Sequence, residues 1–286
     1  MDRDLPGQPL DLLLDGEERV VGCYLVETED GLGLVDCGPA ATFDVLTAAL
    51  AARGVAVTDL RHLLITHIHL DHSGAAGHLI RANPDLLVHA SPIGGLFLGY
   101  PEVLEMSARG VYGDRYDTLW GEMIGVPEEN LVPTDTGVAG LECLPTPGHA
   151  SHHVSFLDRD GTMYTGDAAG VRIVPGTQVT PPTPPPDIDV DAWLASIVAM
   201  QAREPSRLAL THFGVVDDPD RHFDALREAL ADWLALVRTG VDEAEFVRVV
   251  SESIARHGEQ VVYHRTLPMG MLYQGLRGYV ERSAAI

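Results

Sequence analysis

The feature that most constrains the fold is the segment Thr-His-Ile-His-Leu-Asp-His at residues 66–72, which continues the short apolar run that begins at residue 61. Four potential metal ligands stand within six residues, namely His67, His69, Asp71 and His72. Because alternate side chains at the end of a strand project to one side, the first two histidines can converge on one metal. The turn that follows swings the other two ligands toward a neighbouring position. Imidazole and carboxylate without thiolate favour a catalytic site for zinc, manganese or iron.

Three later segments also place a potential ligand after a strand and small residues. They are Pro-Thr-Pro-Gly-His149, Tyr-Thr-Gly-Asp167 and Ala-Leu-Thr-His212. Each segment is a weak signal alone. We expect all three to lie near the first motif.

In order and spacing, these four segments resemble the metallo-β-lactamase superfamily over roughly residues 20–214. The resemblance implies a mixed α/β fold, a four-layer αββα sandwich with metals at one edge between two sheets. It implies that one metal is held by His67, His69 and His149, that the other is held by Asp71, His72 and His212, and that Asp167 bridges both. By the same resemblance Asp36, in Leu-Val-Asp-Cys-Gly, orients ligand histidines without binding metal.

Apolar periodicity predicts strands and helices that alternate through the first part of the chain. The predicted strands are 20–28, 31–36, 61–66, 86–89, 140–144, 153–157, 162–165 and 207–211. The predicted helices are 40–53, 75–82, 190–203, 221–238 and 242–257, with short helices around Leu96, Leu104 and Trp120. The predicted organisation is a core at 1–216 with an insert at 91–130, and a helical C-terminal extension at 217–286 packed on the core. The proline-rich segment 170–189 is expected to be an extended surface loop.

Charge and cysteine content exclude several classes of function. The 286 residues carry a formal charge of −23, and every fixed cation is an arginine. Such a surface disfavours nucleic acid and anionic lipid as partners. Three scattered cysteines indicate no disulfide framework. The N-terminus has no apolar signal region and no stretch is long enough to cross a membrane, so we expect a soluble, cytoplasmic protein.

The expected cofactor is a pair of divalent metal ions, with zinc first and iron or manganese as alternatives. Two cations about 3.5 to 4 Å apart lower the pKa of a shared water and polarise a substrate oxygen. We therefore expect a hydrolase with Asp71 and Asp167 as catalytic residues, Asp71 orienting the nucleophile. In broad outline the chain resembles the glyoxalase II-like branch, although it has no lysine to hold the carboxylates of glutathione.

The expected partner is a small-molecule substrate, an ester, thioester or lactone. It would bind between the insert, the loop 170–186 and the C-terminal helices. Candidate apolar contacts are Phe97, Tyr100, Tyr112, Trp120 and Phe213. His152 and His153 follow His149 closely and are candidates for supporting the ligands, since one side chain would face the site while the other points away from it.

Two alternatives remain open at this point. Sulfur dioxygenases of the same fold oxidise persulfides with one iron, and the matching ligands here would be His67, His149 and Asp167. A metal-binding scaffold without activity is the third interpretation. The apolar stretch Thr266–Tyr273 is expected either to close over the pocket or to form a homodimer interface.

Overall fold

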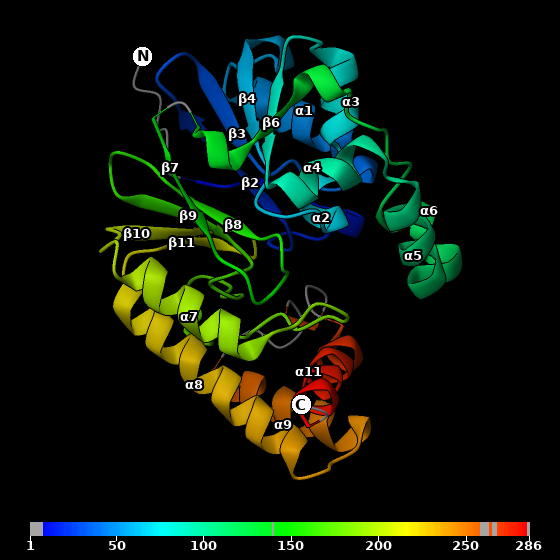
Figure 1. The fold of residues 1–286 in the computed structure, drawn as a ribbon, viewed down its shortest axis with the longest axis vertical. Coiled ribbons are helices and arrows are strands. Elements are labelled where there is room, and N and C mark those ends of the chain that lie inside the picture. The colour runs from blue at the N-terminus through cyan, green and yellow to red at the C-terminus, as the bar shows by residue number, and fades with distance from the viewer. Residues whose placement is uncertain (1–7, 139, 258–262, 265–267, 285–286) are drawn as a thin grey trace.

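Two β-sheets lie against each other at the centre of the molecule (Figure 1). The computed structural model describes residues 8–138, 140–257, 263–264 and 268–284. The first sheet has the order β1-β2-β3-β4-β5-β6, formed by β1 (Leu10–Asp11), β2 (Gly22–Glu27), β3 (Leu32–Val35), β4 (Leu60–Leu64), β5 (Leu87–Ala90) and β6 (Leu131–Pro133). The second has the order β11-β10-β9-β8-β7, formed by β7 (Glu142–Pro145), β8 (Val154–Leu157), β9 (Thr162–Gly166), β10 (Arg207–Leu210) and β11 (Gly214–Val216). The predicted strands are confirmed within one or two residues at most ends, whereas β1, β6 and β11 were too short for their periodicity to show.

Helices cover the outer face of each sheet. The α-helices of the described residues are α1 (Phe43–Ala52), α2 (Leu70–Ser73), α3 (Ala76–Ala82), α4 (Pro92–Gly99), α5 (Glu102–Tyr112), α6 (Tyr116–Leu119), α7 (Val190–Gln201), α8 (Pro219–Arg238), α9 (Glu243–His257) and α11 (Met269–Ser283). Figure 1 shows α1 and α3 beside the first sheet, and α7 and α8 along the second. The order of layers is therefore helix, sheet, sheet, helix.

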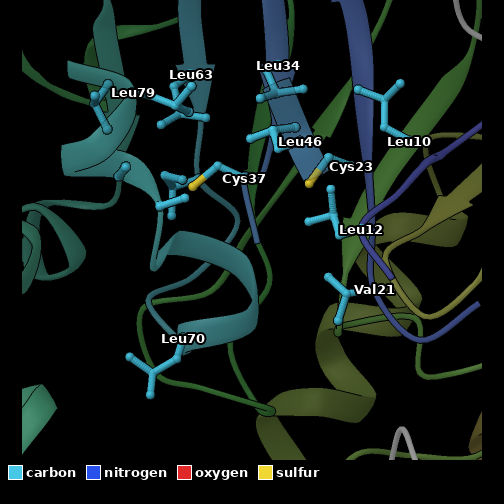
Figure 2. Close-up of a cluster of buried hydrophobic side chains, with 14 of the residues drawn as sticks. Leu10, Leu12, Val21, Cys23, Leu34, Cys37, Leu46, Leu63, Leu70 and Leu79 are labelled. Atoms are coloured by element: carbon cyan, nitrogen blue, oxygen red, sulfur yellow. The ribbon is translucent and has the colours of Figure 1, made fainter. Parts of the chain in front are cut away.

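Three separate groups of buried apolar side chains fill the spaces between these layers. Tyr24 and Leu64 of the first sheet pack against Phe156 and Tyr164 of the second. Another group joins the first sheet to α1 and α3, and Figure 2 shows its members Leu34, Leu46, Leu63 and Leu79 beside the thiols of Cys23 and Cys37. A third group joins the second sheet to α7, α8, α9 and α11. Because each interface has its own apolar filling, the predicted αββα fold is confirmed.

The insert 91–130 forms the three short helices predicted for it, α4, α5 and α6. Figure 1 shows α5 and α6 at the margin of the molecule, away from both sheets. Accordingly α5 has no fully buried side chain. One of its faces lines a cavity, described below.

The proline-rich segment differs from the surface loop that was expected. Pro181, Pro182 and Thr183 are buried, whereas Pro175 and Thr177 before them and residues 185–187 after them are exposed. The Thr183 hydroxyl donates a hydrogen bond to the carbonyl of Leu272 in α11, at 2.9 Å. A segment without regular structure is buried here because a helix distant in sequence covers it.

The C-terminal part contains α8 and α9 as predicted and, in addition, α11. Thr266 and Leu267 of the predicted apolar stretch lie outside the described residues. Met269, Leu272 and Tyr273 are buried within this chain. The homodimer stays a prediction, and these three side chains are already covered by intramolecular contacts. Within the described ranges, no helix has the length and apolarity needed to span a bilayer.

Candidate metal centre

The strand β4 delivers the first ligands to the edge between the two sheets. It ends at Leu64, and α2 begins at Leu70. His67 and His69 lie in the connection, while Asp71 and His72 lie in the single turn of α2. The turn is closed by the N–H groups of His72 and Ser73, which both donate to the carbonyl of His69 at 3.0 Å, and Cys37 N–H donates to the carbonyl of His72 at 2.7 Å. The predicted strand followed by a tight turn is confirmed.

Three imidazoles and one carboxylate converge on a first point. His69 Nδ1 lies 2.9 Å from His67 Nε2 and 3.0 Å from His149 Nε2. Asp167 Oδ2 lies 3.3 Å from His149 Nε2 and 4.0 Å from His67 Nε2. Ligands that surround a zinc ion tetrahedrally at 2.0 to 2.1 Å lie about 3.3 Å from one another. The four atoms are therefore spaced as a metal ion requires.

A second group shares the same carboxylate. Asp167 Oδ1 lies 3.4 Å from His72 Nε2 and 3.4 Å from His212 Nε2. Asp71 Oδ2 lies 3.4 Å from His212 Nε2 and 4.0 Å from His72 Nε2. Asp167 thus turns one oxygen toward each group of histidines, as a carboxylate bridging two cations would.

Hydrogen bonds on the far side of the rings set the tautomers of the histidines. His149 Nδ1 donates to the carbonyl of Pro182 at 2.8 Å, and His212 Nδ1 donates to that of Val20 at 2.5 Å. His72 Nδ1 donates to Asp36 Oδ2 at 2.7 Å. With Nδ1 protonated, each Nε2 keeps its lone pair, which is the form that binds metal.

Two buried polar atoms support a metal at this place. Within the described part of the chain, His72 Nε2 and Asp167 Oδ1 have no hydrogen-bond partner. Buried polar atoms without a partner are costly, so they are expected to be satisfied by something bound there. Together with the nitrogen and oxygen donor set, these atoms fit divalent metal ions.

Electrostatics favour positive charge at this centre. Burial lowers the pKa of His149 to about 3, so its ring is neutral at pH 7. Burial opposes ionisation of Asp71, but His72 and His212 outweigh it and lower its pKa to about 2. For His72, burial is outweighed by Asp167, Asp36 and Asp71, which raise its pKa. The carboxylates attract positive charge to this point, either as a proton or as a bound cation.

Supporting residues near the centre were only partly anticipated. Both predicted candidates contact it, because His152 Nε2 accepts from Ile68 N–H at 3.3 Å and His153 Nε2 accepts from Asp167 N–H at 3.2 Å. Thr66, which was not predicted, donates from its backbone and hydroxyl to Asp36. The available signal in the sequence was that Thr66 is the first residue of the segment 66–72. The backbone carbonyls of Pro182 and Val20, which accept hydrogen bonds from His149 and His212, cannot be recognised in a sequence, because every residue has a backbone carbonyl.

A cavity of about 570 Å³ opens onto the centre. The insert, the proline-rich loop and α11 all contribute to its walls, as expected for the substrate pocket. Among the predicted apolar contacts, Tyr112 and Trp120 line it. Phe97, Tyr100 and Phe213 do not appear among its lining residues, and Tyr100 is 73% exposed. His264, to which no role was given, lies at its wall.

Comparison with known proteins gives a family model described as the metallo-beta-lactamase superfamily, which matches residues 16–212. The metallo-beta-lactamase fold-containing protein ST1585 of Sulfurisphaera tokodaii is 28% identical over 165 residues, 55% of this chain and 62% of that protein. An atrochrysone carboxyl ACP thioesterase of Pseudocercospora fijiensis is 28% identical over 125 residues, 43% of this chain and 29% of that protein. The match thus spans less than two thirds of each relative.

Solved structures share the fold. The metallo-beta-lactamase family protein TTHA1429 of Thermus thermophilus superposes with a TM-score of 0.62 at 20% identity, over 93% of this chain and 89% of that one. The structure of TTHA1623 in a di-iron-bound form superposes with a TM-score of 0.53 at 26% identity, over 69% of this chain and 89% of that one. The second of these proteins holds two metal ions of its own.

Proposed function

Because the chain belongs to the metallo-beta-lactamase superfamily, we propose that it is a hydrolase that uses two metal ions to cleave a small ester, thioester or lactone. One observation carries the proposal, namely that Asp167 points one carboxylate oxygen at each of two histidine groups. A thioesterase among the relatives and a di-iron form among the structural neighbours support the reaction class and the metal count.

The residues of the centre have distinct proposed roles. His67, His69 and His149 hold one metal, Asp71, His72 and His212 hold the other, and Asp167 binds both. Bound cations of this kind acidify water and polarise a carbonyl oxygen. Zinc is the proposed metal, with iron and manganese as alternatives that the same nitrogen and oxygen donors would also bind.

Asp71 has a second proposed role beside its contact with His212. Its side chain is 24% exposed, and it lines the cavity. With a pKa of about 2 it remains a carboxylate at neutral pH, so it can accept a hydrogen bond from an attacking water and orient it. The apolar walls of the cavity exclude other water from the reacting bond.

The first test is metal content, measured by mass spectrometry on protein purified without added metal, together with turnover of thioesters, lactones and phosphodiesters. We expect about two ions per chain and hydrolysis that falls at least 100-fold in Asp167→Asn, because removing a bridging charge weakens both sites. Asp160→Asn, which changes an exposed carboxylate in the same way, is the control.

Two outcomes would contradict the hydrolase. One iron per chain with oxygen uptake on a persulfide and no hydrolysis would favour the dioxygenase that uses His67, His149 and Asp167. Bound metal with neither reaction would favour a scaffold without activity.

A further inference from the structure

The walls of the cavity are apolar over most of their surface. Leu14, Leu119 and Trp120 are buried in one wall, while Leu272 is buried in the wall formed by α11. The metal ligands His69, Asp71, Asp167 and His212 line the end at the metal centre. A cavity of about 570 Å³ is within the usual size for a small-molecule site, so most of the contact area of a ligand would be apolar.

The charges around the cavity are negative. Asp15 and Glu17 line it, in addition to the metal ligands Asp71 and Asp167, whose charges bound cations would offset. Among the described lining residues Arg115 is the fixed cation, and its Nη2 lies 3.4 Å from Asp15 Oδ2. A carboxylate or phosphate on the ligand would lose its water and meet these acidic groups. These acidic groups therefore favour a substrate that is uncharged in the part that lies away from the bond to be cleaved.

The aromatic rings of the cavity are already engaged with each other. Tyr112 and Trp120 pack edge to face, with their centroids 5.1 Å apart and planes at 70°. On the other side the Tyr112 hydroxyl contacts Met271 Sδ at 4.0 Å, so that α5 and α11 meet. The remaining apolar wall residues are leucine, valine, methionine, proline and Ala108, whose aliphatic side chains fit a flexible alkyl chain better than a flat ring.

We propose that the substrate is an uncharged ester-type molecule whose acyl part is an aliphatic chain, and that this chain occupies the cavity between α5, α11 and the proline-rich loop. The inference rests on the proposed hydrolase and narrows its substrate class. Ala108 and Ser107 on the inner face of α5 define how much chain the cavity accepts.

The test compares acyl thioesters of N-acetylcysteamine, from acetyl to dodecanoyl, and sets hexanoyl against adipoyl, which has a carboxylate in place of the terminal methyl group. The metal-loaded enzyme is expected to gain up to about fourfold in kcat/KM per methylene until the cavity is full. Adipoyl is expected to be at least about tenfold poorer than hexanoyl. A flat profile, or a preference for adipoyl, would overturn the inference.

Variants of α5 locate the chain. Ala108→Phe is expected to move the optimum to shorter chains, and Ser107→Phe serves as a second variant if the first does not fold. Met106→Phe is the matched control, because Met106 lies on the same helix, is 71% exposed and does not line the cavity. The same shift in Met106→Phe would contradict the assignment.

A binding measurement separates this inference from the proposed function. Uncharged alkyl amides are titrated calorimetrically into Asp167→Asn, which needs no turnover. Affinity that rises with chain length and is lost in Ala108→Phe supports the inference even if no ester is hydrolysed. Hydrolysis without any dependence on chain length supports the hydrolase and refutes the inference.

Discussion

Asp36 connects the two sheets at the metal centre although it contacts no metal position directly. Its carboxylate accepts hydrogen bonds from Thr66 N–H at 2.8 Å, from His72 Nδ1 at 2.7 Å and from the Thr211 hydroxyl at 3.3 Å. Its φ of 55° is a left-handed conformation that residues other than glycine rarely adopt. Such a conformation persists where surrounding contacts over-determine it, and these hydrogen bonds do so here.

Asp36→Asn is therefore expected to weaken metal binding by about 10- to 100-fold. The amide has one acceptor oxygen instead of two, and its NH₂ group would face the N–H of His72. Competition with a chromogenic chelator measures the affinity. Asp44→Asn, on an exposed residue of α1, is expected to bind metal as the wild type does. Equal affinities for both variants would show that Asp36 does not orient the ligand.

His222 makes the stability of the fold depend on pH. Its Nε2 donates to the carbonyl of Ala169 at 2.7 Å, and burial lowers its pKa from 6.5 to about 4. Between these two pH values the unfolded chain binds the proton more readily than the folded chain does. Stability is therefore full above pH 6.5 and is lost as the pH falls toward 4, by up to about 3 kcal/mol.

His222→Gln keeps a donor for Ala169 and removes this titration. Urea unfolding of metal-loaded protein at several pH values is expected to show a smaller loss of stability in this variant than in the wild type. His78→Gln, a half-buried histidine with a similar bond to Glu122, should retain the slope of the wild type. Parallel curves for all three proteins would remove His222 as the cause.

At the scale of elements, α11 and the proline-rich loop are packed without space between them. A Cβ on Gly275 would lie 2.0 Å from the carbonyl oxygen of Thr183 and 2.9 Å from the carbonyl carbon of Pro184. Pro182 directly precedes Thr183 in the chain, and its carbonyl accepts the hydrogen bond that orients His149. The position of α11 therefore influences both the wall of the cavity and a ligand of the first metal.

Gly275→Ala is expected to destabilise the fold by about 1 to 3 kcal/mol, because backbone atoms must move to admit the methyl group. Metal affinity should fall as well. Gly278→Ala on the same helix meets only the end of the Arg282 side chain, at 3.2 Å, and should be neutral or stabilising. Urea unfolding and metal titration of both variants give the comparison. A stable Gly275→Ala with normal metal binding would contradict this coupling.

At the scale of the whole molecule, the C-terminal helices share one apolar group with the second sheet. Trp193 and Met200 of α7 belong to it together with Phe223 of α8 and Phe246 of α9. We propose that residues 217–286 are an extension packed on the core 1–216 and not a domain with a core of its own. We infer this because the helices of this extension share one hydrophobic core with the second sheet, whereas an independent domain has a hydrophobic core of its own.

A chain that ends after Val216 is consequently expected not to reach the native state. Trp193 and Met200 would lose the side chains that cover them, and the truncated chain should bind a hydrophobic dye and lack a native near-ultraviolet circular dichroism spectrum. The full chain is the control. A truncated chain that unfolds cooperatively and binds metal would show that the core is independent.

The sequence by itself determined the local features of this protein. The four ligand segments were recognisable because each begins to supply ligands within four residues of a strand end and because their order and spacing resemble those of the metallo-β-lactamase superfamily. Apolar periodicity located the main strands and helices. Asp36 was also found, because Leu-Val-Asp-Cys-Gly matches the acidic residue that the family has after an early strand. These features depend on neighbours in the chain, which the sequence displays directly.

The tertiary structure alone decided what depends on distant segments. It placed the carbonyls of Val20 and Pro182 behind two histidines, buried the start of the proline-rich loop beneath α11, and selected Tyr112 and Trp120 as cavity walls. Backbone carbonyls are the same in every residue, and burial depends on which element covers a segment. Neither property can be read from local sequence, so both emerge only when the sheets and helices are packed together.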